Sequence, residues 1–209
     1  MLTIAIAKGR VQDDALQLCA RAGISFDKHN PASRQLAIYD ESREYRFIFV
    51  KPADVPVYVE HGIADCGIVG RDVLMESSSD LLMPLDLRFA RCRMIVASRN
   101  GESLTNVGMI RVATKYPRVA ASHFGGRGIP VEIIQLSGSV ELAPMLGLAD
   151  CIVDLMETGR TLQENGLSVI EEIADSTARL VVNRASYQLK SKALAGLIRS
   201  LSQAVNGIK

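Results

Sequence analysis

HGIADCGIV (residues 61–69) and LGLADCIVD (residues 146–154) share one pattern, in which glycine and an aliphatic residue lead into Ala-Asp-Cys and an apolar segment. Each copy is typical of a helix that ends at glycine, a turn at aspartate and then a buried strand. The segments IAIAKGRV (4–11) and VATKYPRV (112–119) also correspond, because both run from a strand through lysine to arginine at a predicted helix start. The repeat therefore predicts two lobes built on one plan.

Short apolar segments alternate with amphipathic ones along the chain, which predicts an α/β fold with mostly parallel sheets. Helices are expected over residues 11–22 and 188–205. We assign residues 1–90 plus about 176–209 to the first lobe and about 91–175 to the second, with a cleft between them that receives the carboxyl ends of both sets of strands. The strands are predicted at residues 3–7, 47–50, 66–69, 94–97, 111–114, 131–135 and 151–155.

The composition, 48% hydrophobic and 22% charged, is that of a globular chain. Its apolar runs are far shorter than the ~18 residues of a membrane-spanning helix, and no charged leader precedes the first one. We therefore expect a cytoplasmic protein with no membrane partner. The four cysteines form no CxxC pair and the three histidines form no HExxH motif. This pattern predicts reduced thiols and no dedicated transition-metal site, so that any metal arrives with the substrate.

The net charge of +1 is unevenly distributed along the chain. Residues 88–127 hold eight basic residues and one acid, Glu102, which makes this section strongly positive. A basic section in a nearly neutral protein favours an anionic ligand, although a solvated basic face explains the same count. Nucleic acid is disfavoured as a partner, because aromatic residues make up 5% of the chain and tryptophan is absent.

The most informative stretch is CIVDLMETGRTLQENGL (151–167). An apolar strand runs to Asp154, and the chain then turns through Glu157, Thr158, Gly159, Arg160 and Thr161 into a predicted short helix. A strand, a Thr/Gly turn and a helix start direct unpaired backbone N–H groups at one point, which suits a phosphate. The upstream carboxylate suits ribose hydroxyls, so the stretch predicts a site for ribose 5-phosphate.

The alternative for this stretch is an ordinary capped turn. Thr161 and Glu164 fit a T-x-x-E capping box, and Gly166 can end the helix. In LSGSVELAP (136–144), Ser137 or Ser139 is expected to cap a helix with Glu141 in its first turn.

Further cations lie near predicted strand ends. Lys8 and Arg10 follow the first strand in AKGR, and Arg34 and Lys51 occur in PASRQ and VKPADVP. Each of these residues taken singly fits an ordinary surface position equally well.

Taken together, these motifs resemble the ATP phosphoribosyltransferase family, which opens histidine biosynthesis. The resemblance covers essentially the whole chain in order, and the length matches the family's short form. The motifs that carry it are AKGR, DVPVYVEHGIADCGIVGRDVL (54–74), RVATKYP (111–117), GSVELAP (138–144), GLADCIVDLMETGRTLQENGL (147–167) and RLVVN (179–183).

The resemblance implies transfer of ribosyl 5-phosphate from phosphoribosyl pyrophosphate (PRPP) to N1 of ATP, with Mg²⁺ as cofactor and release of pyrophosphate. It also implies two lobes similar to type II periplasmic binding proteins. Lys115 and Tyr116 would contact ATP, and Arg10 and Arg34 would be the catalytic residues that stabilise the leaving pyrophosphate. The residues implied to bind PRPP are Lys8, Lys51, Glu141, Asp154, Glu157, Thr158, Gly159, Arg160 and Thr161.

Short forms of the family work with a regulatory subunit that resembles histidyl-tRNA synthetase, so the resemblance implies a hetero-octamer, with a homodimer possible for the isolated chain.

A second functional hypothesis, that the protein is a binding module and not an enzyme, remains open at this point. Two-lobed folds also serve as non-catalytic modules that bind small anions or sense effectors.

Overall fold

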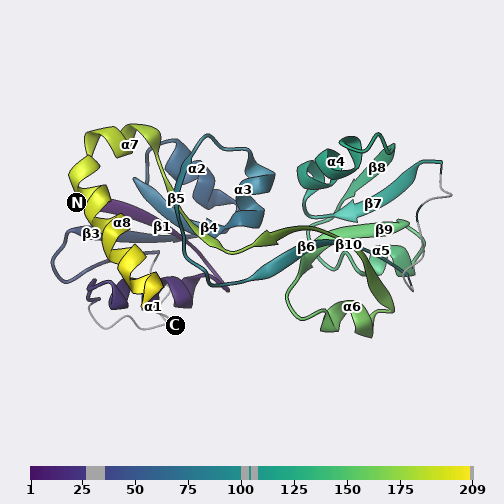
Figure 1. The fold of residues 1–209 in the computed structure, drawn as a ribbon, viewed down its shortest axis with the longest axis horizontal. Helices are drawn as coiled ribbons and strands as arrows, with labels where there is room; N and C mark the ends of the chain where they lie inside the picture. The colour runs from purple at the N-terminus through teal and green to yellow at the C-terminus, as the bar shows by residue number, and fades with distance from the viewer. Residues whose placement is uncertain (27–35, 100–103, 105–107, 208–209) are drawn as a thin grey trace. The chain divides into compact units, whose positions relative to one another are not determined.

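The computed structural model describes residues 1–26, 36–99, 104 and 108–207. The chain divides into two compact units (Figure 1). Unit 1 contains Met1–Ala90 and Thr177–Lys209, and unit 2 contains Arg91–Ser176. Each unit has its own sheet, so each is described by itself.

The sheet of unit 1 has the order β2-β3-β1-β4-β11-β5. Its centre, β3-β1-β4, is parallel, whereas β2, β11 and β5 pair antiparallel with their neighbours. The strands are β1 (Leu2–Ala7), β2 (Ala37–Tyr39), β3 (Tyr45–Val50), β4 (Cys66–Gly70), β5 (Leu82–Asp86) and β11 (Ala178–Val182). The helices are α1 (Gln12–Arg21), α2 (Asp54–Glu60), α3 (Arg71–Ser77), α7 (Arg184–Leu189) and α8 (Ser191–Asn206).

The core of unit 1 forms around β1, every residue of which is buried. Such a strand reads as an apolar run without polar alternation because helices cover both of its faces. Helix α2 packs on β1 and β4, and α1 packs against α8. Helix α8 buries one stripe of residues three or four apart, which is the spacing of a single helix face: Leu194, Leu197, Leu201 and Val205.

The sheet of unit 2 has the order β10-β6-β9-β7-β8, with β9-β7-β8 parallel and β10 and β6 antiparallel. Its strands are β6 (Cys92–Arg99), β7 (Ile110–Thr114), β8 (Val131–Gln135), β9 (Cys151–Met156) and β10 (Leu167–Ser176). Its helices are α4 (Pro117–Gly125), α5 (Leu142–Met145) and α6 (Arg160–Glu164).

The internal repeat corresponds to the parallel half of each sheet. In unit 1 the aspartate of Ala-Asp-Cys, Asp65, donates its N–H to Thr3 O at 2.8 Å and accepts the Thr3 N–H at 2.9 Å. In unit 2 the matching residue, Asp150, makes the same two hydrogen bonds to Arg111, both at 2.8 Å. This match makes β1 equivalent to β7, and β4 equivalent to β9.

The two-sheet α/β architecture predicted from the sequence is confirmed, and each of the predicted strands is present. The sheets are mixed, so the expectation of mostly parallel strands holds only for their central strands. The reason is that β5 and β6 lead the chain into unit 2, whereas β10 and β11 lead it back. The outgoing and returning strands pair in each sheet, β6 with β10 and β5 with β11, and therefore run antiparallel.

The C-terminal helix expected over residues 188–205 is confirmed as α8, but it begins at Ser191, because a break at Lys190 separates it from α7. At the break, Lys190 Nζ lies 2.8 Å from Asp65 Oδ2. The ion pair with Asp65, which lies deep in unit 1, explains why the chain turns there.

Other sequence expectations concern thiols and membranes. All four cysteines are free and buried, and burial raises the pKa of Cys19 and of Cys151 to about 12. The thiols of Cys19 and Cys151 are therefore protonated at neutral pH. Within the described ranges, the helices are too short or too polar to span a bilayer.

The network around Asp65 generates a prediction about stability. Burial alone would raise the pKa of Asp65, but hydrogen bonds from Lys190, the Thr3 N–H and Ser186 lower it below its usual value. A carboxylate with a lowered pKa stabilises the fold above its unfolded pKa, and that stabilisation is lost as the pH falls. We expect Asp65→Asn to lower the free energy of unfolding by about 1–3 kcal/mol at neutral pH.

Denaturant titrations across pH measure this effect. The difference between Asp65→Asn and the wild type should shrink below about pH 4, where the wild-type carboxylate takes up its proton. Glu41→Gln, at an exposed turn, serves as the control and should leave stability unchanged. A pH-independent difference would show that the charge of Asp65 does not stabilise the fold.

Candidate active site

The carboxyl ends of the three parallel strands of unit 2 meet at one edge of its sheet. Thr114, the last residue of β7, lies opposite Gln135 of β8 and Val153 of β9. The residues that follow these positions therefore extend beyond the paired region together, as expected at the ligand-binding edge of an α/β sheet. Lys115 is exposed there, and Tyr116 and Asp154 are half-buried.

Asp154 is the most perturbed carboxyl group at this edge. Its pKa is raised to about 6, chiefly by burial and also by the negative charge of Glu141, while the Leu155 N–H and Lys115 act in the opposite direction. These electrostatic effects show that Glu141 and Lys115 lie near Asp154. A half-buried carboxylate of this kind gains from hydroxyl donors or cations supplied by a ligand.

The Thr/Gly loop follows Asp154 and leads into α6. Gly159 has φ +81°, the left-handed conformation that favours glycine, and a Cβ at this position would lie 3.1 Å from Met156 Sδ. Gly159 is the N-cap of α6, and Gln163 donates its N–H to Gly159 O at 3.1 Å. Glu157, Thr158, Arg160 and Thr161 are exposed. The loop therefore places two threonine side chains at the surface, and Thr158 Oγ1 accepts the Arg160 N–H at 3.5 Å.

The capping box expected at Thr161 and Glu164 is wrong. Because Gly159 adopts the left-handed conformation, α6 begins at Arg160, and Thr161 is already its second residue. Glu164 instead accepts a hydrogen bond from Arg160 Nε at 2.8 Å. Gly166, with φ +66°, does follow the end of the helix as expected.

The helix cap expected in LSGSVELAP is also different. Glu141 is the N-cap of α5 itself, rather than a residue of its first turn, and among the described residues no side chain caps this helix. Ser139 lies in the left-handed region, with φ +48°, so the turn precedes the helix by two residues. This placement brings Glu141 within electrostatic range of Asp154.

The matching edge of unit 1 carries cations. Ala7 lies opposite Val50, so Lys8 and Lys51 follow neighbouring strands and lie side by side in the register. Lys8, Arg10 and Lys51 are exposed, and Gly9 between the first two has φ +88°. Arg71, which the sequence reasoning did not single out, follows β4 at the same edge. The signal that could have found it is a basic residue directly after the buried run CGIVG.

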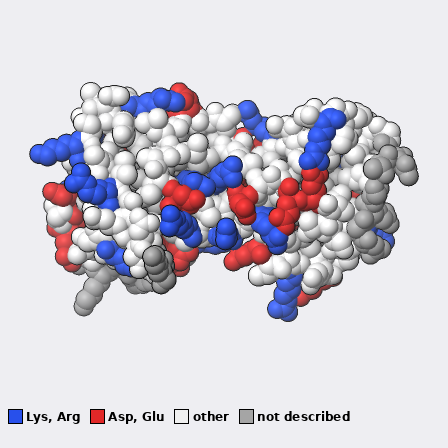
Figure 2. Space-filling view, viewed as in Figure 1, with Lys and Arg blue, Asp and Glu red and all other residues white. Residues whose placement is uncertain are grey.

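The structure leaves the role of Arg34 untested and weakens the argument from the basic section 88–127. Arg34 lies outside the described residues, so its role stays a prediction. Of the cations in the basic section 88–127, Arg93, Arg111 and Arg127 form ion pairs with Glu172, Asp150 and Glu171. Blue and red side chains accordingly adjoin in Figure 2. Carboxylates elsewhere in unit 2 thus neutralise part of this section, which weakens the inference of an anionic ligand from charge alone.

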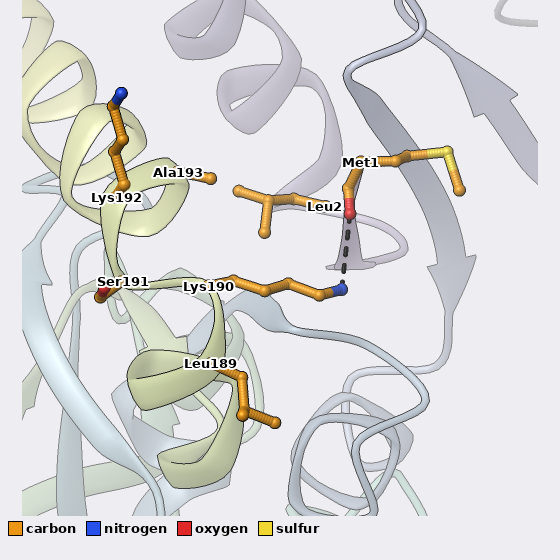
Figure 3. Close-up of a pocket in the computed structure, with 7 residues that line it drawn as sticks. All are labelled: Met1, Leu2, Leu189, Lys190, Ser191, Lys192 and Ala193. Atoms are coloured by element: carbon orange, nitrogen blue, oxygen red, sulfur yellow. Dashed lines mark hydrogen bonds between the residues drawn. The ribbon is translucent and has the colours of Figure 1, made fainter.

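A cavity of about 320 Å³ in unit 1 lies away from these loops (Figure 3). It is lined by Met1, Leu2 and residues 189–193, and Lys190 Nζ reaches across it to Met1 O at 3.4 Å. Leu2 begins β1, whereas Lys8 follows its end, so the cavity lies at the opposite edge of the sheet from the candidate ligand-binding residues.

Comparison with known proteins identifies both fold and family. The chain superimposes on the periplasmic aliphatic sulphonate binding protein of Escherichia coli with TM-score 0.61 at 12% identity, covering 98% of this chain and 72% of that one, which shows a shared fold alone. The family model for ATP phosphoribosyltransferase (HisG) matches residues 51–203. The "ATP phosphoribosyl transferase (HisG:HisZ) complex from Thermotoga maritima" contains a chain with TM-score 0.87 and 36% identity, covering 99% of this chain and 100% of that one.

Relatives known by sequence agree. The ATP phosphoribosyltransferase of Caldanaerobacter subterraneus subsp. tengcongensis is 50% identical over 207 residues, 99% of both chains. That of a Geobacillus species is 49% identical over 205 residues, 98% of this chain and 99% of its own. The family model and these relatives define a pentosyltransferase with a two-lobed fold. The chain belongs to the ATP phosphoribosyltransferase family, in its short form, and is an enzyme of histidine biosynthesis; the hypothesis of a non-catalytic binding module is disfavoured.

The raised pKa of Asp154 predicts that this residue destabilises the fold. The folded-state value of about 6 lies above the ordinary 3.8, so the folded state holds the proton more tightly, and ionisation at neutral pH costs free energy. Asp154→Asn should therefore raise the free energy of unfolding by up to about 3 kcal/mol at neutral pH.

Thermal and denaturant unfolding across pH test this expectation. The gain should decline as the pH falls through about 6 and vanish near 4, where both proteins are uncharged at this position. Glu157→Gln, at an exposed carboxylate of the same loop, is the matched control and should change little. Equal stability of Asp154→Asn and the wild type at neutral pH would contradict the buried, disfavoured charge.

Proposed function

We propose that unit 2 binds the ribose 5-phosphate part of PRPP. The observation that carries this proposal is the left-handed Gly159, which opens α6 directly after the strand that holds Asp154. Backbone N–H groups of residues 158–161 and the threonine hydroxyls surround the 5-phosphate, with Arg160 adding positive charge. Asp154 accepts hydrogen bonds from the ribose hydroxyls, and Glu157 and Glu141 complete the polar surroundings of PRPP.

We assign the remaining ligand contacts by charge. Lys115 and Tyr116 contact ATP, and the cationic edge of unit 1 contacts phosphate through Lys8, Lys51 and Arg10. Arg10 and Arg34 stabilise the charge that develops on the leaving pyrophosphate. The assignment of Arg34 rests on the resemblance of the sequence to its family alone.

The reaction then needs positioning and electrostatics more than acid–base groups. N1 of adenine supplies the electron pair that forms the new N–C bond at the anomeric carbon of PRPP. The bond between that carbon and the pyrophosphate oxygen breaks, and the electron pair leaves with pyrophosphate. Asp154 holds the ribose, and the cations stabilise negative charge on the leaving group, which are effects worth several kcal/mol in transfers of this kind.

Mg²⁺ fits this site as an ion carried by the substrate. Among the residues that the structure describes, no cluster of three Asp, Glu, His or Cys side chains forms a metal site on its own. Asp154 and Glu141 are carboxylates of the kind that Mg²⁺ accepts as one or two protein ligands beside phosphate oxygens. When bound, the ion neutralises charge on the pyrophosphate.

We also propose a regulatory partner of the type named in the Thermotoga maritima complex, HisZ. The partner resembles histidyl-tRNA synthetase and forms a hetero-octamer with this chain. The isolated chain forms a homodimer, and the complex works in the cytoplasm, where ATP and PRPP are made.

The first experiment tests the reaction itself. Purified chain, ATP, PRPP and Mg²⁺ should release pyrophosphate, and chelation of Mg²⁺ should abolish the release. Gly159→Val should weaken PRPP binding at least about tenfold, because a side chain displaces the backbone that contacts the phosphate.

Gly166→Val is the matched control for that substitution. Gly166 has a similar positive φ at the other end of α6, with no atom within 4 Å of its Cβ position, so its substitution imposes the same backbone strain away from the loop. Calorimetric titration with PRPP should show near wild-type affinity for Gly166→Val. Equal losses in the two variants would mean that the loop does not bind phosphate.

A separate prediction concerns regulation. The chain alone should show low activity without a response to histidine, and addition of the HisZ-type partner should raise the activity and confer inhibition by histidine. Steady-state rates at increasing histidine, with and without the partner, measure both effects. Strong inhibition of the lone chain by histidine, non-competitive with ATP and PRPP, would refute this division of roles.

A further inference from the structure

Thr114 has the one hydroxyl group in the otherwise apolar and basic sequence of β7, IRVAT. Its exposed fraction is 0%, and it makes two hydrogen bonds. Its Oγ1 donates to Val153 O at 2.6 Å and accepts the Tyr116 N–H at 2.8 Å. One buried hydroxyl thus connects the backbone of Tyr116 to the residue directly before Asp154.

The other copy of the repeat shows that this strand position itself does not require a hydroxyl. Cys66 lies opposite Ile4 in unit 1 and Cys151 lies opposite Val112 in unit 2, so the register makes Thr114 equivalent to Ile6. Ile6 is fully buried and apolar. The same strand position is therefore stable without any side-chain hydrogen bond.

The two copies differ in what happens two residues later. In unit 1 the N–H of Lys8 continues the pairing with β3, by donating to Val50 O at 2.8 Å. In unit 2 the equivalent N–H, that of Tyr116, donates to the Thr114 hydroxyl instead. Tyr116 thereby leaves the strand and becomes the N-cap of α4, with φ −121° and ψ 64°. By the same register, the residue of unit 2 that is equivalent to Ala7 is Lys115, and the residue equivalent to Lys8 is Tyr116.

We propose that Thr114 is a positioning residue for the transfer reaction, whose hydroxyl fixes the Lys115–Tyr116 turn relative to the Val153–Asp154 segment. This proposal rests on the proposed function, in which the turn contacts ATP and Asp154 contacts ribose. Two substrates that must meet within bonding distance are sensitive to small shifts between the groups that hold them, and such shifts lower the rate of the chemical step. Thr114 touches neither substrate and acts through both segments.

Substitutions at Thr114 separate the hydroxyl from the shape of the side chain. Thr114→Val keeps the branched shape that Ile6 shows to be tolerated and removes the hydroxyl, whereas Thr114→Ser keeps the hydroxyl. We expect Thr114→Val to lower kcat by about tenfold or more while KM for ATP and for PRPP stays within about threefold. Thr114→Ser should stay within about threefold of the wild type in all three constants.

Ser98→Ala is the control for the loss of a buried hydroxyl. Ser98 lies in β6 of the same sheet with an exposed fraction of 1%, and it is not one of the proposed ligand-binding residues. Its substitution should change the melting temperature without changing kcat. If Thr114→Val does not fold, Thr114→Ala compared with Thr114→Ser tests the same hydroxyl by the same criterion.

The outcomes are distinct. A loss of kcat that serine rescues supports the positioning role. An unchanged kcat without the hydroxyl, a change confined to KM or to melting temperature, or an equal loss of kcat in Thr114→Ser would overturn it. A wild-type chain that releases no pyrophosphate from ATP and PRPP would instead refute the proposed function, which is a separate result.

Discussion

A pair of hydrogen bonds made by one aspartate sets the register in each unit, and the ligand-binding edges depend on it. Asp65 and Asp150 each donate a backbone N–H to, and accept one from, the start of the central parallel strand. These bonds fix the position of each Ala-Asp-Cys strand along its neighbour. A slip of one residue would exchange the side chains between the two faces of the sheet and disrupt the packing of the helices on both. With the register fixed, the parallel strands of each unit end level with one another, and the loops that follow them emerge at one edge.

The same scaffold has acquired different chemistry in its two copies. The edge in unit 1 carries the cations Lys8, Lys51 and Arg71, whereas the edge in unit 2 carries a perturbed carboxyl group, Asp154, next to a helix-opening glycine. Cations suit the pyrophosphate, and a carboxylate with backbone N–H groups suits a sugar phosphate. Two copies of one structural plan thus present chemically different residues at their candidate ligand-binding edges.

Local patterns in the sequence predicted the parallel strands and the repeat, because buried strands leave continuous apolar runs and the Ala-Asp-Cys turn recurs. The strands β2, β5, β10 and β11 were not predicted. Strand β10 leaves no apolar run, since it is a half-exposed edge strand with bulges and carries Glu171, Glu172 and Asp175. Two other misses had tertiary causes. The left-handed Gly159 moved the start of α6 away from the capping box, and the ion pair of Lys190 with Asp65 divided the last helix. The residues of the Thr/Gly loop lie together as expected, because they are adjacent in sequence, and their role as phosphate ligands stays a prediction.

The charge of Asp154 lowers the stability of the fold, so stability alone does not explain why an aspartate occupies this position. Its carboxylate is half-buried and near Glu141, so ionisation opposes folding. A group that only served stability would be replaced by asparagine or an apolar residue, which fit the same strand position without the charge. Under the proposed function, ribose hydroxyls would donate hydrogen bonds to this carboxylate and offset part of that cost. A ligand without such donors would leave the charge uncompensated and gain less from binding.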